Sequence, residues 1–322
     1  MRYSLLSRFR GALLGSLVGE ILGSGSRHSL IFGGLSFTLP ETEGDKAVET
    51  PLITPQLSDW SQIATSGIKS LINRGRLDVE DWLLHAAKTP PTLALLKKSA
   101  SSSEVAVVTL PVALFFHDNE IKLQQQLQQV ATVWQRFEGY EGVLAVGYAI
   151  ALALTEKLNS ATLIPRTISY LGTSQTTLVQ QLEQVQTLIE QGTGLDSTVT
   201  KLRHEAQRLG QPPLNPFTSI AIAIYCFLTT PEDFRLSVSR AVRSCYQPQI
   251  TAALTGAIAG AYNSNIGIPV GWRLAANRIN IGNERLQLAD HLLAVWSGVY
   301  EISDVEPFPW AAIAAPRVIG PR

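Results

Sequence analysis

Few side chains in this sequence have the types and the spacing that could support chemistry at one site. Ser58 and Asp59 stand together at a predicted helix start, where a hydroxyl and a carboxylate could ligate a cation or contact a ligand. The simpler interpretation is that Asp59 is a charge that stabilises the positively polarised first turn of that helix. Glu20, in a predicted buried helix, has two interpretations as well: a role in a site, or a structural hydrogen bond to the start of a neighbouring helix.

Three further residues could line a ligand pocket with Ser58 and Asp59. Gln247 and Gln249 flank a proline in a turn before a helix of small residues, and their amides could line a polar pocket or be solvated. Trp60 directly follows the acidic residue, and its ring could fill space as packing or stack on a base. The candidate site therefore depends on two short stretches that are far apart in the sequence.

The histidines and cysteines do not form a recognisable catalytic or metal-binding set. Neither Cys226 nor Cys245 has the neighbours of an activated nucleophile, and two cysteines exclude a disulfide framework and a thiolate metal site. The five histidines lack the paired spacing of metal ligands: His28, His85, His117, His204 and His291. We therefore expect no Ser/His/Asp or Cys/His mechanism.

Composition excludes several classes of protein. The chain has 322 residues, 45% of them hydrophobic and 16% charged, with a formal net charge of zero, which argues against a nucleic-acid binder. The two longest apolar runs, Val143–Leu154 and Phe217–Leu228, fall short of the roughly 20 residues that a membrane span requires. Glu20 interrupts the apolar run near the N-terminus and no A-x-A site follows, which argues against a signal peptide. We expect a cytoplasmic protein without a membrane span.

Two glycine-rich helices are the strongest structural signal. Residues Leu5–Gly23 predict a helix with glycines at intervals of four, and the helix that follows Gln249 carries Gly256 and Gly260 one turn apart. Because each interior glycine costs a helix about 1 kcal/mol relative to alanine, another backbone should approach closely there. The second of these helices is expected to be central and packed on every side.

The remaining chain also reads as helices. Ser58 caps a predicted helix that reaches Asn73, and Thr230-Pro231-Glu232-Asp233 predicts a helix start with Thr230 as the cap. Other helices are expected at Val143–Leu158 and Glu284–Tyr300. No strand alternation appears, so the sequence predicts an all-α fold: a single compact multi-helix orthogonal bundle over residues 1–322, in which 159–213 form a peripheral helical layer or a linker.

Three stretches match, in order and spacing, the motifs of one known family. Residues 8–23 read RFRGALLGSLVGEILG against the pattern R-x-x-G-A-L-x-G-x-x-x-G-D-A-L-G. Residues 58–61 read SDWS where that family has T-D-D-T, and residues 245–250 read CYQPQI where it has G-G-D-T-D-T. On these motifs, and on Ile268-Pro269 further along, the chain resembles the ADP-ribosylglycohydrolase family over nearly its whole length.

The resemblance implies the fold more directly than the chemistry. Family enzymes use two magnesium ions, held by the hydroxyls and carboxylates of the second and third motifs, to position ADP-ribose and cleave its glycosidic bond. Asp59 keeps one of those carboxylates, but the others fall on Trp60, Gln247 and Gln249, and the last threonine falls on Ile250. Two dications need hard, mostly anionic oxygen ligands, which this set does not supply. The family's substrate loop before Pro111 is replaced by 103–108, SEVAVV.

Three hypotheses follow from this pattern. The first is a non-catalytic relative, a pseudoenzyme without a cofactor, that binds an ADP-ribose-like small molecule or a protein partner. The second is an active magnesium-dependent hydrolase with a rearranged site, in which Ser58, Asp59 and Glu20 hold one cation. The third is a structural or assembly scaffold that binds no nucleotide.

Overall fold

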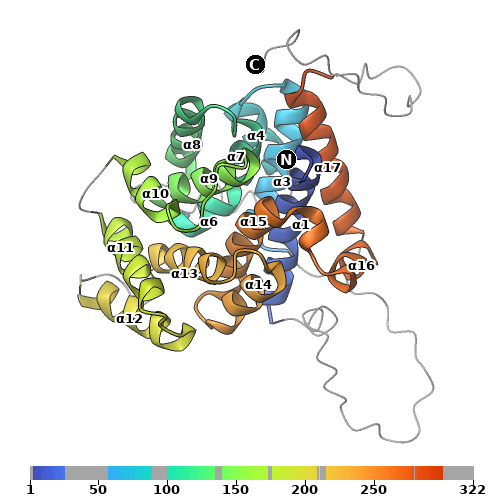
Figure 1. Ribbon diagram of the computed structural model, residues 1–322. Helices are drawn as coiled ribbons and strands as arrows, with labels where there is room; N and C mark the ends of the chain where they lie inside the picture. The colour runs from blue at the N-terminus through green and yellow to red at the C-terminus, as the bar shows by residue number, and fades with distance from the viewer. Residues whose placement is uncertain are drawn as a thin grey trace, which may run out of the picture.

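A computed structural model describes residues 3–25, 57–88, 100–134, 140–172, 176–208, 210, 215–278 and 280–299, and these form helices joined by short connections (Figure 1). No strand occurs in these ranges, so the predicted all-α class is confirmed. The helices are α1 Leu5–Gly23, α3 Asp59–Arg74, α4 Val79–Ala87, α6 Ser102–Val108, α7 Leu110–Phe115, α8 Glu120–Trp134, α9 Glu141–Leu154, α10 Leu163–Leu171, α11 Thr177–Glu190, α12 Leu195–Arg208, α13 Pro216–Thr229, α14 Phe234–Arg243, α15 Pro248–Gly267, α16 Val270–Arg278 and α17 Ile281–Trp296.

Helices α1 and α15 pack together more extensively than any other pair in the described part of the chain. They run antiparallel, and the backbone of one touches the backbone of the other along the glycine stripe. A Cβ atom added at Gly15 would collide with the carbonyl oxygen of Gly256, and one added at Gly260 would collide with that of Gly11. The close approach predicted from the glycine spacing is thus confirmed, and it is the reason that these costly helix residues stand there.

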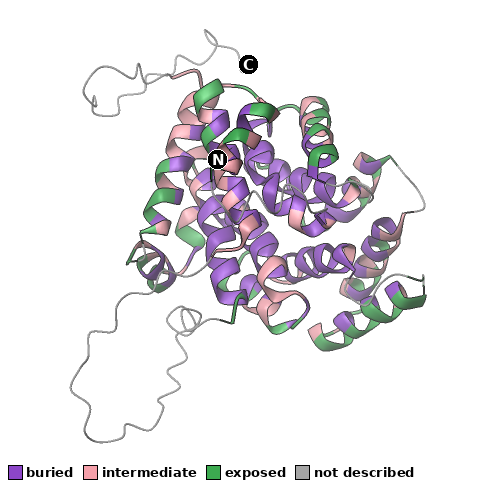
Figure 2. Cartoon of the chain, turned by 180° about the vertical axis from the view of Figure 1, so that it is seen from behind, coloured by how far each residue is buried: buried purple, intermediate pink, exposed green. Residues whose placement is uncertain are grey.

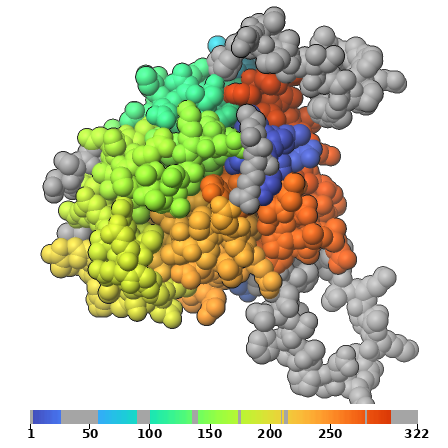
Figure 3. Space-filling view, in the orientation of Figure 1, coloured from blue at the N-terminus to red at the C-terminus, as the bar shows by residue number. Residues whose placement is uncertain are grey.

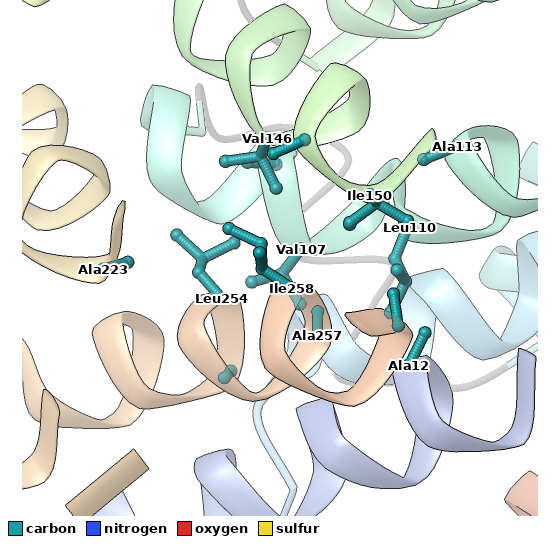
Figure 4. Close-up of a cluster of buried hydrophobic side chains, with 14 of the residues drawn as sticks. Ala12, Val107, Leu110, Ala113, Val146, Ile150, Ala223, Leu254, Ala257 and Ile258 are labelled. Atoms are coloured by element: carbon teal, nitrogen blue, oxygen red, sulfur yellow. The ribbon is translucent and has the colours of Figure 1, made fainter. Parts of the chain in front are cut away.

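The other faces of α15 carry the hydrophobic core. Besides α1, it contacts α6, α9, α13 and α14, so it is the central helix that the sequence predicted. Leu254 and Ile258 extend from α15 toward Val107 of α6 and Val146 of α9 (Figure 4). The buried residues gather on these inner helices, whereas exposed residues lie on the outer ones (Figure 2).

Helices α11 and α12 lie at one edge of the molecule (Figures 1 and 3). Leu178, Leu182 and Val185 of α11 are fully buried and face α13, while the outer side of α12 is exposed. The assignment of residues 1–322 to one domain stays a prediction.

Local capping explains where several helices begin. Ser58 accepts a hydrogen bond from the amide of Ser61 and starts α3, and Ser101 forms a reciprocal capping box with Glu104 at the start of α6. The predicted start at Thr230 is wrong, because this residue ends α13 and Asp233 is the cap of α14. Helix α9 ends at Leu154, four residues before the predicted end, and Glu156 just beyond it has a left-handed backbone.

Two C-terminal features differ from the sequence prediction. Helix α16 was not predicted, and α17 begins at Ile281 rather than at Glu284 and ends at Trp296 rather than at Tyr300.

Arg10 of α1 forms two hydrogen bonds of 2.6 Å with the carboxylate of Asp290, which ties α17 to the central pair. Among the helices described, none has the length and apolar character needed to cross a bilayer.

Candidate functional site

The antiparallel pairing of α1 and α15 brings the candidate residues to one end of the molecule's central helix pair. Gly23, at the end of α1, packs against Pro248 and Gln249 at the start of α15. One turn back along α1, Glu20 contacts the start of α3 through Ser58. The end of α1 and the starts of α3 and α15 therefore converge, although they are far apart in the sequence.

Glu20 is a buried carboxylate with a structural partner. It is 3% exposed, and its Oε1 atom accepts a hydrogen bond of 2.6 Å from the backbone amide of Ser58. The Oγ atom of Ser58 in turn accepts from the amide of Ser61 at 3.2 Å. This is the hydrogen bond to a neighbouring helix start that was one of the two interpretations of Glu20, and it satisfies amides that the first turn of α3 leaves open.

The next two residues of α3 have different environments. Asp59 is half-buried in the first turn, and within the described part of the chain its carboxylate makes no hydrogen bond or ion pair. Trp60 is 7% exposed and packs in the hydrophobic core. The ring of Trp60 therefore acts as packing where the family motif has a second carboxylate.

The turn before α15 has an unusual backbone. Cys245 and Gln247 have φ angles of 52° and 40°, in the left-handed region that is costly for residues other than glycine. The turn is held by Tyr246, whose hydroxyl accepts a hydrogen bond of 2.6 Å from the amide of Asn215. The carbonyl oxygen of the Gln247 side chain accepts a hydrogen bond from the hydroxyl of Ser219. Gln247 is thus bound to α13, whereas Gln249 is half-buried on the first turn of α15.

A buried arginine lies against the α3 part of the site. Arg285 of α17 is 5% exposed and donates from Nη2 to the Oγ atom of Ser61 at 3.0 Å and to its carbonyl oxygen at 3.2 Å. Burial lowers the pKa of Arg285, and the nearby negative charges of Glu20 and then Glu284 partly oppose this effect. Arginine nevertheless stays protonated in proteins, so a positive charge is fixed beside Ser61.

Arg285 was not among the residues predicted for the site, although the sequence contains a signal for it. Arg285, Leu288 and Leu292 share one face of α17 through the i, i+3, i+7 spacing of a helix, and all three are buried. A charged residue on an otherwise apolar face indicates a buried functional or structural cation.

The donor atoms near this site do not match what a pair of magnesium ions requires. In the described ranges, no group of three or more His, Cys, Asp or Glu side chains comes close enough to hold a metal ion. Glutamine oxygens supply no charge, and Trp60 and Ile250 supply no ligand. Within the part of the chain that the structure describes, the remaining carboxylates here are Glu20, which is bonded to Ser58, and Asp59. A dinuclear magnesium centre does not fit these residues.

A small cavity lies beside Arg285 among the described residues. This cavity of about 10 Å³ lies between the core and the polar groups of Ser16, Ser61 and Arg285, which is room for about one water molecule. The stretch 103–108, which corresponds to the family's substrate loop, lies within helix α6. Ser103 is fully buried in that helix.

Comparison with known proteins identifies the fold and the family. A search of the curated proteins gives no match. A solved structure described as an "ADP-ribosylglycohydrolase-related protein complex" is similar, with a TM-score of 0.62 and 19% sequence identity over 90% of this chain and 98% of that one. The sequence model of the ADP-ribosylglycohydrolase family matches residues 1–301. Because this match covers almost the whole chain, the protein belongs to the ADP-ribosylglycohydrolase family.

Proposed function

We propose that this protein is a non-catalytic member of its family, which uses the helical frame to bind a ligand or a partner. The observation that carries the proposal is the bond between Arg285 and Ser61. Ser61 stands where the family motif has its second threonine, and its hydroxyl faces a guanidinium. A fixed cation at that point repels a metal ion from a hydroxyl that could otherwise ligate it.

The charge balance supports the same conclusion. Two magnesium ions bring four positive charges, and a partly buried site must compensate them with anions. Among the described residues near the starts of α3 and α15, the carboxylates are Glu20 and Asp59, and the negative charge of Glu20 already acts on Arg285. Arg285 therefore supplies a positive charge near Glu20 within the chain itself.

Calorimetric titration with magnesium and with ADP-ribose tests the proposal directly. We expect no heat from magnesium, whereas micromolar binding of both ligands would end the proposal. The positive control is one variant with four substitutions, which restore the family carboxylates and remove the competing cation: Trp60→Asp, Gln247→Asp, Gln249→Asp and Arg285→Met. If the absence of those carboxylates is what prevents the natural chain from binding magnesium, this variant should gain magnesium binding.

An active hydrolase with a rearranged site is the second candidate. It is favoured by the hydrogen bond that brings Glu20 to Ser58, next to the carboxylate of Asp59, which has no partner among the described residues, so that one cation could be held there. A release assay on ADP-ribosylated arginine and serine decides between the two. Turnover that Asp59→Ala abolishes would favour the hydrolase; release no greater than a blank, in both proteins, rejects it.

The ligand of the non-catalytic protein is proposed to be an ADP-ribose-like small molecule or a protein partner. Binding of ADP-ribose without magnesium in the same titration would indicate the first. The similar solved structure carries the word "complex" in its description, and this favours a test of assembly as well. Size-exclusion chromatography with light scattering, followed by cross-linking, measures association; the absence of any stable partner would count against the scaffold alternative. The cytoplasmic location stays an expectation.

A further inference from the structure

A second pocket lies at the C-terminal end of α15 and is built from residues that the candidate site does not use. It lies between the end of α15, helix α16 and the start of α17, and these three elements meet at the lower right of Figure 1. Its volume is about 230 Å³. Its apolar walls are Leu14, Val270, Leu274 and Leu286.

The polar part of this pocket lacks partners within the described chain. Arg273 makes no hydrogen bond or ion pair there, and its Nε atom is buried. The Oδ1 atoms of Asn265 and Asn277 are also buried without a partner. An unsatisfied buried polar group costs about 1–3 kcal/mol, so three in one pocket are expensive unless something binds them.

The backbone explains how Asn265 reaches this position. Helix α15 is broken at Ser264, which has φ and ψ angles of 63° and 178°. The break lies beside α1, because a Cβ atom at Gly11 would stand 2.6 Å from the carbonyl carbon of Ser264 and 2.8 Å from the amide nitrogen of Asn265. The packing of α1 thus helps to set the geometry of one side of the pocket.

We propose that this pocket binds a small carboxylic acid that has an apolar body and a hydrogen-bond donor. The Arg273 guanidinium has no partner among the described residues, and it matches a carboxylate, which it can bind through two parallel hydrogen bonds. The amide oxygens of Asn265 and Asn277 accept hydrogen bonds, so they match a hydroxyl or an amino group on the ligand. No Asp or Glu is among the described residues that line the pocket, so these walls do not repel an anion.

The size of the pocket favours a small molecule over a protein. Its volume is below the roughly 300–1,000 Å³ of sites for drug-sized ligands. The exposed apolar side chains beside it are Ile266, Val270 and Leu274, which are 67%, 61% and 54% exposed. These three side chains make only a narrow collar, whereas a stable protein interface buries on the order of 1,000 Å² or more.

The test uses the full-length protein and 2-hydroxy-4-methylpentanoate as the probe. Ligand-observed NMR and calorimetry are expected to give a dissociation constant of about 1 mM or tighter. The neutral amide of the same acid should bind at least about tenfold more weakly because it lacks the negative charge. Removal of the hydroxyl, in 4-methylpentanoate, should weaken binding severalfold.

The variant Arg273→Gln keeps a polar side chain but removes the charge, and binding of the acid should fall at least about tenfold. The matched control is Arg278→Gln, an exposed arginine of the same helix that does not line the pocket, and it should bind like the natural chain. Without ligand, Arg273→Gln should melt no lower than the control, because the arginine has no described partner to lose. Failure of the acid to bind, equal binding of the amide, or equal loss in both variants would overturn the proposal. The result is independent of the magnesium and ADP-ribose titrations.

Discussion

The substitution Gly15→Ala tests how far the frame of this protein depends on backbone contact. In an exposed helix this change stabilises by about 1 kcal/mol, since glycine is a poor helix former. At Gly15 the new Cβ atom would overlap the carbonyl oxygen of Gly256, and it would lie 3.0 Å from Cε2 of Phe234 and 3.1 Å from the carbonyl carbon of Gly256. Favourable carbon contacts begin at about 3.5 Å, so α1 and α15 must move apart.

The expected cost follows from what blocks the relaxation. Overpacked cores lose about 1–3 kcal/mol, and here the obstacle is a helix backbone that no side-chain rotation can move. We therefore expect Gly15→Ala to lower the free energy of unfolding by about 2 kcal/mol. Gly271 of α16 is the matched control, because a Cβ atom there would meet nothing within 4 Å. Gly271→Ala should be neutral or stabilising by up to about 1 kcal/mol.

Urea unfolding followed by circular dichroism measures both variants, and a double mutant sharpens the test. A Cβ atom at Gly256 would collide with the carbonyl oxygen of Gly15, so the two substitutions force the same separation of the helices. The double variant Gly15→Ala/Gly256→Ala should therefore lose less than the sum of the single losses, by about 0.5 kcal/mol or more. The reasoning is refuted if Gly15→Ala matches Gly271→Ala in stability.

Three further predictions concern buried ionisable groups. Arg285→Met should lower the free energy of unfolding by about 3 kcal/mol because it leaves Glu20 without its nearby cation. The double variant Arg285→Met/Glu20→Gln should recover part of that loss. Unfolding in urea measures both variants, and additive losses would contradict the coupling of the two residues. Burial lowers the pKa of His117 below 6.5, so the unfolded chain takes up a proton first as the pH falls. The free energy of unfolding should therefore fall below about pH 6.5 until the folded pKa is reached, with a slope of at most about 1.4 kcal/mol per pH unit. This slope should shrink in His117→Gln, and an unchanged slope would show that other groups cause it. A thiol reagent at neutral pH should modify the exposed Cys245 quickly and Cys226 only after unfolding, since burial raises the pKa of Cys226 to about 12; two fast thiols in the native protein would contradict this.

The elements that rely on backbone sterics could be predicted from the sequence. Glycines stand at four-residue intervals on two helices, at Gly11 and Gly15 on the first and at Gly256 and Gly260 on the second. This spacing predicts close contact between helices. The start of α3 was predicted from its cap, since the hydroxyl of Ser58 can accept a hydrogen bond from an amide of the first turn.

Predictions failed where two local signals competed or where tertiary contacts decided. Thr230 and Asp233 are both good caps on either side of a proline, and only the packing of α13 and α14 shows that Asp233 starts a helix. Arg285 reaches Ser61 across a separation of 224 residues, so no local pattern could pair them. Helix α16 is short, with exposed Val270 and Leu274 among its apolar residues, and the amphipathic pattern that marks most helices is therefore weak.

The frame and the chemistry of this protein are set by different kinds of atom. The antiparallel contact of α1 and α15 is made between backbone groups and needs only the absence of side chains at the glycines. That contact fixes where Glu20 and the turn at Gln247 lie, whatever side chains those positions carry. Catalysis by a metal pair, in contrast, needs particular carboxylates, and each can be lost without disturbing the helix contact. Glu20 is buried, and a buried charge without an opposite charge is costly. The positive charge of Arg285, which interacts with Glu20, offsets part of that cost within the chain itself.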